Sequence, residues 1–356
     1  MSTPGPSPAA TPVAAAHDDE SGAVLVTGAA GEVGHGLLRA LAEAGRSVVA
    51  VDRRELEPDE RAACRAAVVA DVTDAPAMEQ LVREHEVGEV MHLAAMLSSS
   101  GERDPERAHA VNVGGTLQLL RIAAEQGQRS GRPVKFILPS TIAVYGVPSV
   151  AAKDAAGAVT EDQFLEPITM YGCNKLACEQ LGRYYQRHYR QLDDPPGAGN
   201  IDFRAVRYPG LISPDTLPSG GTSDYAPEMI HAAVAGRPYA CFVDRDARIP
   251  FMTMREAIDA TLDLAAAPAE RLSRITYNIG SFAPTAEELA AALTELGVAA
   301  DVTFQRDALR APIVDSWPAD VDCSAAARDF GFAPRHDLMS ALRDELIPGI
   351  RAAQSS

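Results

Sequence analysis

The chain has 356 residues, of which 46% are hydrophobic and 23% charged, a composition typical of a globular protein with one large or two modest cores. Its formal net charge of −17 argues against nucleic acid or an anionic membrane as a partner, because a surface of this charge would repel both. The five cysteines are scattered without Cys-x-x-Cys or Cys/His spacing, so we predict neither a disulfide framework nor a metal site, and we expect a reducing, cytoplasmic compartment.

The first 21 residues are rich in Pro, Ala, Ser and Thr and contain no Lys or Arg, which predicts a disordered tail. A signal peptide or a mitochondrial presequence would carry early basic charge, so neither is expected. No apolar run approaches the roughly 20 residues that a membrane span requires.

An apolar run beginning at Val24 leads into a Gly-x-x-Gly-x-x-Gly turn, and helical periodicity follows. This order predicts a strand, a phosphate-binding loop and a helix. Gly28 and Gly31 would let the backbone turn and approach a pyrophosphate, while Gly34 would let the helix pack close to the strand. A β-α turn also needs glycine for steric reasons alone, so the triplet by itself is a weak indication.

The second strand, 47–51, strengthens this prediction because Asp52 stands at its end, 18 residues after Gly34. An acid at this place can accept hydrogen bonds from both ribose hydroxyls of an adenine dinucleotide and would repel the phosphate of NADP, so we expect NAD as cofactor. Arg53 is the neighbouring residue that could neutralise such a phosphate. The alternative, a solvated aspartate at a strand end, is disfavoured by the order strand, loop, helix, strand, acid.

Short apolar runs then alternate with amphipathic stretches, which predicts an α/β fold with a doubly wound parallel sheet of six or seven strands. Asp104 and Pro105 mark the start of one long helix as N-cap and first helical residue. The expected strands are 66–70, 89–93, 134–138 and 201–206, and the expected helices are 75–84, 105–126 and 170–189.

After residue 210 the strict alternation stops, which predicts a second, smaller domain. We expect a Rossmann domain that binds NAD from 22–210 and 251–279, and a substrate-binding domain from 211–250 and 280–352. Thr285 and Glu288 have capping-box spacing. The elements expected in the smaller domain are helices 224–235, 285–296, 324–330 and 338–350 and strand 240–243, whereas helix 255–266 and strand 276–279 are expected to return to the sheet.

Tyr171 and Lys175 lie four residues apart near the start of a long predicted helix, so both side chains project from one face. An ammonium beside a phenol lowers the pKa of the phenol, which would make Tyr171 a base near neutral pH. Thr141 follows the fifth strand, at the edge where parallel sheets place their ligands, and its hydroxyl could orient a substrate. The alternatives are a surface Tyr/Lys pair and a turn cap at Ser140 and Thr141.

The chain resembles the extended short-chain dehydrogenase/reductase family over nearly all of residues 22–350. The matching stretches are 27–34, 71–74, 92–95, 112–116, 140–146 and 171–175. The resemblance implies catalytic roles for Thr141, Tyr171 and Lys175. It also implies that the cofactor contacts the glycine loop and a further set of residues, which comprises Gly28, Gly31, Glu32, Val33, Gly34, Asp52, Asp71, Val72, Leu93, Ala94, Ala95, Asn112, Tyr171, Lys175, Tyr208 and Pro209.

Within that family, stretches 96–102, 207–213 and 218–226 resemble the short-chain L-threonine 3-dehydrogenases. This implies NAD-dependent oxidation of L-threonine to 2-amino-3-ketobutyrate. A Gly-Gly-Thr turn before a helix is by itself a small-anion site suited to an amino-acid carboxylate, with a plain helix cap as the alternative. The residues expected at the substrate are Ser98, Ser140, Thr141, Gly221, Thr222 and Arg248.

Two other functions remain open. A UDP-sugar 4-epimerase or dehydratase of the same family uses the same catalytic residues, and Arg248 would then bind a diphosphate. A non-catalytic NAD-sensing regulator is disfavoured by the intact pair of Tyr171 and Lys175, since a sensor has no use for a tuned phenol. The segment 148–162 is longer than a compact dehydrogenase needs and could lie over the active site. Family members pair two long helices, here 105–126 and 170–189, across a two-fold axis, so a homodimer is expected.

Overall fold

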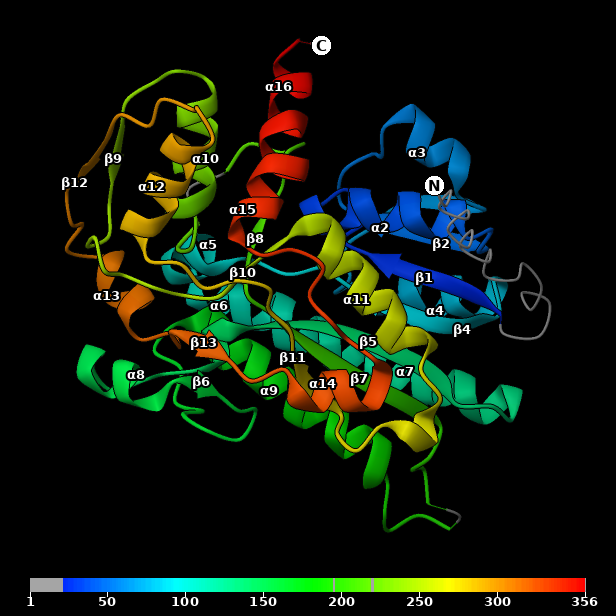
Figure 1. Cartoon of the computed structure of the whole chain (residues 1–356). Coiled ribbons are helices and arrows are strands. Elements are labelled where there is room, and N and C mark those ends of the chain that lie inside the picture. Colours follow the sequence, from blue (N-terminus) through cyan, green and yellow to red (C-terminus); the bar gives the residue numbers. More distant parts are fainter. Residues whose placement is uncertain (1–21, 195, 219–220, 356) are drawn as a thin grey trace, which may run out of the picture.

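Seven parallel strands form the central sheet of the computed structural model, which describes residues 22–194, 196–218 and 221–355 (Figure 1). The chain runs outward from β1 in both directions, so the strand order reverses between β1 and β4 and creates the crevice where such sheets bind ligands. The predicted doubly wound fold is confirmed, whereas the tail predicted at 1–21 lies outside the described residues. In spatial order the strands are β11 (Thr276–Asn278), β7 (Ile201–Tyr208), β5 (Val134–Thr141), β4 (Val87–His92), β1 (Ala23–Thr27), β2 (Val48–Asp52) and β3 (Ala66–Val69).

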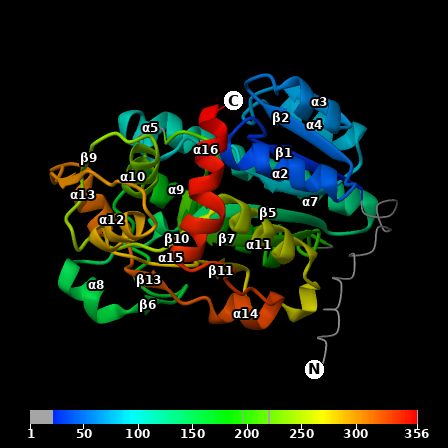
Figure 2. The ribbon, with the colours of Figure 1, turned by 45° about the horizontal axis from the view of Figure 1, so that its top comes forward.

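Helices cover both faces of this sheet (Figures 1 and 2). Apolar side chains from one stripe of each helix meet the buried strands and form two separate cores, as amphipathic helices require. One face carries α4 (Ala75–Glu84), α7 (Gly115–Ser130) and α9 (Met170–Arg187), and the other carries α2 (Glu32–Glu43) and α11 (Met254–Ala266).

The long helix predicted at 105–126 is divided into three parts. Asp104 begins it as predicted, because its side chain accepts a hydrogen bond from Arg107 N at 3.2 Å. After α6 (Pro105–His109) the backbone widens into a π-helical turn, η1 (Ala110–Gly114), and then continues as α7. Such turns are frequent at functional sites, and here the turn places the Asn112 side chain below the loop that follows β4.

A second group of shorter elements lies beside the carboxyl ends of the sheet strands and has its own core (Figure 1). The capping box predicted at Thr285 and Glu288 is present at the start of α12. Three short strand pairs belong here, namely β8 (Gly210–Ile212) with β10 (Phe251–Thr253), β9 (Tyr239–Cys241) with β12 (Val302–Phe304), and β6 (Ala158–Val159) with β13 (Asp320–Val321). The helices are α10 (Tyr225–Val234), α12 (Ala286–Glu295), α13 (Ala311–Asp315), α15 (Leu338–Ser340), η4 (Ala341–Leu346) and α16 (Ile347–Ser355), whereas α14 (Ser324–Phe330) packs against β11 of the central sheet.

Several short elements were not predicted, because a segment of two to seven residues is too short for a hydrophobic period to be recognised. They include α3 (Pro58–Ala63), α5 (Ser98–Arg103), η2 (Ile142–Val144), α8 (Val150–Ala156), β6, β12 and β13.

The segment 148–162, for which we considered a place over the active site, is fastened to other elements. Ser149 caps α8 by accepting from Ala152 N at 3.2 Å, and β6 pairs with β13. The buried Lys153 ammonium donates to Val314 O of α13 at 3.0 Å. These contacts hold the segment against the second group of elements.

The five cysteines are free thiols, and no group of three or more His, Cys, Asp or Glu side chains in the described ranges is arranged to hold a metal ion. In the same ranges no helix combines the length and the apolar character that crossing a membrane would need.

Candidate active site

The loop between β1 and α2 is a cradle that only glycine can form. Gly28 has φ of +71°, and a Cβ at this position would lie 2.6 Å from Ala94 N. A Cβ at Gly34 would lie 2.3 Å from Ala29 O, so the helix approaches the loop more closely than any side chain allows. Gly31, at the N-cap, supplies no side-chain cap to the first-turn N–H groups of α2. The loop therefore fits the pyrophosphate of a dinucleotide.

Asp52 is held beside this loop at the end of β2. Its Oδ2 accepts from Ala30 N at 3.0 Å and its Oδ1 accepts from Arg54 N at 2.9 Å. The neighbouring cation is Arg54, with Nε 3.8 Å from Asp52 Oδ1, whereas Arg53 Nε lies 3.9 Å from Asp71 Oδ2. The sequence indicated Arg53 as the residue that could neutralise a ribose phosphate beside Asp52. In the structure Arg54 lies beside Asp52 and Arg53 lies beside Asp71, a difference that two adjacent positions in the sequence do not reveal.

Asp71 and Val72 form the turn after β3. Asp71 Oδ1 accepts from Thr73 N at 3.0 Å and from Thr73 Oγ1 at 2.8 Å, and the backbone bond is the main cause that lowers the pKa of Asp71. Val72 is buried, and its carbonyl oxygen accepts from Gln118 Nε2 at 3.0 Å. The turn is therefore attached to α7.

Asn112 fixes the loop that follows β4. Its Oδ1 accepts from Met96 N at 2.7 Å and its Nδ2 donates to Met96 O at 3.0 Å. This two-way bond holds the backbone next to Leu93, Ala94 and Ala95, the residues expected to line the cofactor. Asn112 was expected among the residues that contact the cofactor, and in the structure its side-chain Oδ1 and Nδ2 are both bonded to the backbone of Met96, just after that lining.

A buried group of hydrogen bonds around His92 lies below this loop and was not predicted from the sequence. His92 Nδ1 lies 2.7 Å from Thr27 Oγ1, and His92 Nε2 lies 3.0 Å from Thr116 Oγ1. Burial, with a smaller contribution from the charge of Lys175, lowers the pKa of His92 to about 3. The imidazole is thus neutral at physiological pH and ties three elements together. A His after an apolar strand was the signal, but it is too common to be decisive.

Tyr171 and Lys175 lie side by side at the start of α9. Thr169 begins this helix by accepting from Gly172 N at 3.1 Å. Lys175 Nζ donates to Pro139 O at 2.7 Å and lies 5.8 Å from the centroid of the Tyr171 ring. The predicted one-face arrangement of the pair is therefore present.

The expected direction of the Tyr171 pKa was wrong. Burial raises the pKa of this phenol, and repulsion from the ionised forms of the neighbouring Cys178 and Tyr208 side chains raises it further. Burial also lowers the pKa of the Lys175 ammonium. Removing water disfavours both charged forms, and this outweighs the attraction that we expected between ammonium and phenolate.

Thr141 and Ser140 are adjacent on β5 but have different partners. Thr141 Oγ1 accepts from Ala143 N at 3.1 Å at the carboxyl edge of the sheet. Ser140 is buried and donates to Glu179 Oε1 at 2.5 Å, because successive strand residues point to opposite faces. Glu179 in turn receives two bonds from Arg207, at 2.9 and 2.6 Å. The contact of Ser140 with the substrate stays a prediction, since in the structure its hydroxyl is bonded to Glu179.

Ser98 and Thr222, expected at the substrate, are brought together from 124 residues apart, since Thr222 Oγ1 donates to Ser98 Oγ at 2.8 Å. Gly221 differs from the expectation. Its N–H donates to Asp224 Oδ2 at 2.5 Å, so a carboxylate of the chain already takes the proposed anion-binding amide. Arg310 Nη2 donates to Gly221 O at 2.5 Å and brings positive charge here. Arg310 was missed because it lies 89 residues further along the chain.

The same loop also reaches the cofactor cradle. Thr216 Oγ1 donates to Glu32 Oε1 at 2.6 Å, which joins the loop to the first turn of α2. Burial raises the pKa of the Glu32 carboxyl; the Thr216 bond lowers it in part, and the charge of Asp224 raises it further. Val33, the next residue, is partly buried against the apolar core under α2. Residues 219 and 220 of this motif lie outside the described residues.

Three other residues expected at the site have the following places. Tyr208, at the end of β7, shares a 2.6 Å hydrogen bond with Thr261 Oγ1, and burial raises its pKa to about 12. Pro209 follows directly. Arg248 Nη2 pairs with Glu288 Oε2 at 3.0 Å on a side chain that is 40% exposed, and in the described part of the chain it has no hydrogen bond to Ser98 or Thr222.

The chain as a whole is similar to known proteins. The model of the NAD dependent epimerase/dehydratase family matches residues 24–280. The chain is 34% identical over 317 residues to the mitochondrial L-threonine 3-dehydrogenase of Bos taurus, and this covers 88% of the chain and 79% of the relative. The structure of L-threonine 3-dehydrogenase from Trypanosoma brucei is similar at a TM-score of 0.82 and 30% identity, covering 94% of this chain and 98% of that one. A monomeric L-threonine 3-dehydrogenase from a metagenome has a TM-score of 0.79 and 34% identity, covering 93% and 99%.

Proposed function

The chain belongs to the NAD dependent epimerase/dehydratase family, and on this premise we propose that it oxidises the secondary alcohol of L-threonine to 2-amino-3-ketobutyrate with NAD. As a member of this family it is an oxidoreductase with a nicotinamide cofactor and a small-molecule substrate. The observation that carries the proposal is the 2.8 Å bond from Thr222 to Ser98, which unites two stretches characteristic of threonine dehydrogenases.

The cofactor would be held by the glycine loop and by residues at the carboxyl ends of the first strands. Asp52 would accept from the adenosine ribose hydroxyls, Asp71 and Val72 would flank the adenine, and Leu93 to Ala95 would line the remainder. When bound, the nicotinamide accepts the hydride from the substrate carbon.

Tyr171 would take the proton of the substrate hydroxyl, and Thr141 would orient that oxygen by a hydrogen bond. Because burial raises the pKa of Tyr171, its ionised form needs positive charge nearby. Lys175 supplies this charge, and its bond to Pro139 O keeps the ammonium in place.

Threonine is a small zwitterion, so its recognition needs one cationic group and a few hydroxyls. We propose that Arg310 and the Thr222 hydroxyl receive the carboxylate, and that Ser98 binds the polar end of the amino acid. Arg310 takes the role first assigned to the Gly221 amide, because that amide is bonded to Asp224. Arg248, paired with Glu288 on the surface, is left outside this arrangement.

The test is to add L-threonine and NAD to the purified protein and to follow NADH at 340 nm. NADH should accumulate in proportion to threonine. An epimerase would return its hydride, so conversion of a UDP-sugar without net NADH would replace our proposal with the epimerase alternative. Binding of NAD without any turnover would indicate a sensor.

We further propose that residues 22–210 and 251–279 form the NAD-binding domain, and that 211–250 and 280–352 form the substrate-binding domain. This division is supported by the separate apolar cores of the sheet and of the shorter elements. Free thiols support a reducing, cytoplasmic location, although the relative from Bos taurus is mitochondrial. Detection of the protein after cell fractionation tests the location.

We also propose a homodimer through α7 and α9, which pack against each other. Leu117 on α7 and Tyr184 on α9 are each 41% exposed, as apolar surface kept for a partner would be. One relative is described as monomeric, so light scattering at several protein concentrations is the measurement required. A monomer at every concentration would overturn this proposal.

A further inference from the structure

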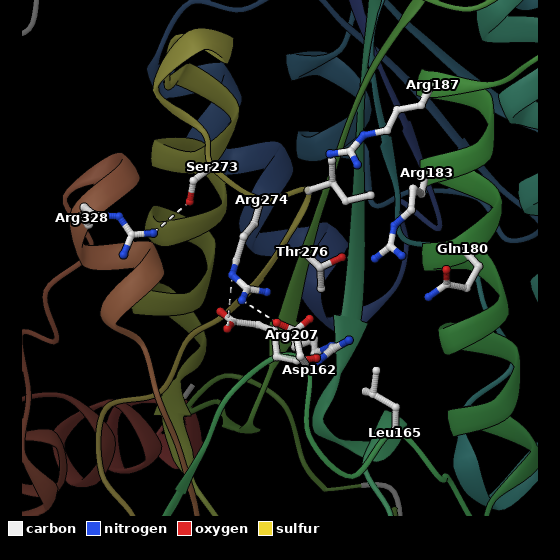
Figure 3. Close-up of a pocket in the computed structure, with 12 residues that line it drawn as sticks. Asp162, Leu165, Gln180, Arg183, Arg187, Arg207, Ser273, Arg274, Thr276 and Arg328 are labelled. Carbon is white, nitrogen blue, oxygen red and sulfur yellow. Dashed lines mark hydrogen bonds and ion pairs between the residues drawn. The ribbon is translucent and has the colours of Figure 1, made fainter.

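An arginine-rich cavity of about 460 Å³ lies at the β11 edge of the sheet, between α9 and α14 (Figure 3). Arg183 and Arg187 reach into it from α9, Arg328 from α14, and Arg274 from the residues just before β11. Its size is suited to a small metabolite. Five of the twelve lining residues are arginines and two, Glu161 and Asp162, are acids, so the lining is net positive on a chain with a net charge of −17.

Two of these arginines, Arg183 and Arg187, are in no ion pair within the described residues. Within the described residues, neither Arg183 nor Arg187 has a carboxylate within 4.0 Å, the limit for an ion pair. Arg274 pairs with Asp162 at 2.5 Å, but the Asp162 side chain is 69% exposed. Exposed ion pairs contribute little free energy, so Asp162 can yield Arg274 to a stronger anion.

The floor of the cavity contains an unsatisfied polar group. Thr276 is only 6% exposed, and its Oγ1 has no hydrogen-bond partner among the residues that the structure describes. Buried hydroxyls are normally bonded, so an orphan hydroxyl in a cationic cavity favours a ligand with acceptor oxygens. Arg207 also lines the floor, but both of its bonds to Glu179 are made inside the protein.

The cavity is separate from the candidate active site. Arg183 follows Tyr171 by 12 residues on the same helix, which corresponds to roughly 18 Å along the axis. Guanidinium groups bind phosphate oxygens through paired N–H bonds, and three of them can surround one phosphate group from different sides. We propose that this cavity binds a small phosphorylated metabolite through Arg183, Arg187 and Arg274.

The experiment is calorimetric titration of inorganic pyrophosphate into the protein saturated with NAD, at constant ionic strength. Saturation with NAD keeps the probe away from the glycine loop, which also attracts phosphate. We expect one binding event per chain. The double variant Arg183→Gln/Arg187→Gln should weaken it by about tenfold or more, since each removed group ends a charge-assisted bond. Asp162→Asn should strengthen it several-fold, because it removes one of the two carboxylates paired with Arg274; the other, Glu161, lies 3.8 Å from Arg274 Nε and remains.

The matched control is Arg39→Gln/Arg83→Gln, which removes the same charge from two exposed helical positions outside the cavity. This variant should bind pyrophosphate as the parent protein does. The proposal is overturned if the parent protein shows no saturable binding, if both double variants lose affinity equally, or if citrate binds more tightly than pyrophosphate.

Discussion

Two glycine-containing loops of this protein lead into helices, yet the two helices begin with different N-cap residues. The loop before α2 ends in Gly31, which adds no side chain to the helix N-terminus, so the positive end of the helix dipole faces outward. The loop before α10 ends in Asp224, whose carboxylate accepts from Gly221 N. In both loops one backbone amide is bonded to a carboxylate of the chain, but Asp52 reaches Ala30 N from β2 and leaves the N-cap of α2 without an acid, whereas Asp224 is itself the N-cap of α10.

This difference shows that a glycine turn before a helix is a weaker indication of an anion site when the N-cap residue is itself an acid that accepts from an amide of the turn. In the second loop the binding groups come from elsewhere, from Ser98 on α5 and from Arg310. A hydrogen bond from Thr216 to Glu32 also joins the two loops, so a change in the conformation of one loop can alter the other. Each variant predicted below alters a residue of one loop, the residue beside it, or Tyr171, and the pH profile is measured on the parent protein.

The largest effect should come from Tyr171→Phe, which removes the acid/base group while both loops remain. We expect kcat to fall by about a hundredfold or more, since general base catalysis contributes about this much. NAD affinity, measured by fluorescence titration, should be unchanged. An equal loss of NAD affinity would mean that Tyr171 supports the first loop instead of the chemistry.

Thr222→Ala breaks only the second loop. Losing the hydroxyl should raise KM for threonine by about ten- to a hundredfold, because a hydrogen bond to a charged group contributes roughly 1.5–3 kcal/mol. NAD affinity should not change. Thr303→Ala, at an exposed position of β12, is the control. In combination with Ser98→Ala the effects should be less than additive, as expected for bonded partners.

The pH profile separates the chemistry from binding in either loop. Because burial holds the pKa of Tyr171 above its ordinary value, the ionised fraction is small near neutral pH and grows about tenfold per pH unit. We therefore expect kcat/KM for threonine to rise with pH from about 7 to 9. A plateau near pH 7 would indicate the lowered pKa that the Tyr/Lys spacing suggested.

Asp52→Ala tests the loop between β1 and α2. The carboxylate should repel the ribose phosphate of NADP, so the parent protein should prefer NAD. In the variant, the ratio of kcat/KM with NAD to kcat/KM with NADP should fall about tenfold. Arg54, which lies beside Asp52, becomes available to that phosphate in the variant. Equal efficiency with both cofactors in the parent protein would contradict the assignment of Asp52.

The smallest effect concerns the acid of the second loop. Asp224→Ala frees the Gly221 amide and removes a negative charge near Glu32, so we expect KM for threonine to fall roughly two- to fivefold. Asp215→Ala, an exposed acid of the same loop, should leave KM unchanged. A rise in KM for Asp224→Ala would show that this carboxylate binds the substrate ammonium.

Local features of this protein followed from the sequence. The alternation of strands and helices, the Asp104 cap, the Thr285 capping box and the helices at 75–84 and 324–330 lie where they were predicted. Each depends on backbone hydrogen bonds and side-chain period within a few neighbouring residues. The glycine cradle belongs to this class, since the steric demand at Gly28 and Gly34 arises inside one β-α unit and its adjoining strand.

Tertiary structure alone decided which groups meet and how much water they keep. The bond from Thr222 to Ser98 and the contact of Arg310 with Gly221 join segments 124 and 89 residues apart, which no local pattern connects. Ser140 and Thr141 received different partners because the sheet buries one face under α9. Burial also reversed the expected pKa direction of Tyr171, since the solvation of a charge depends on every element packed around it.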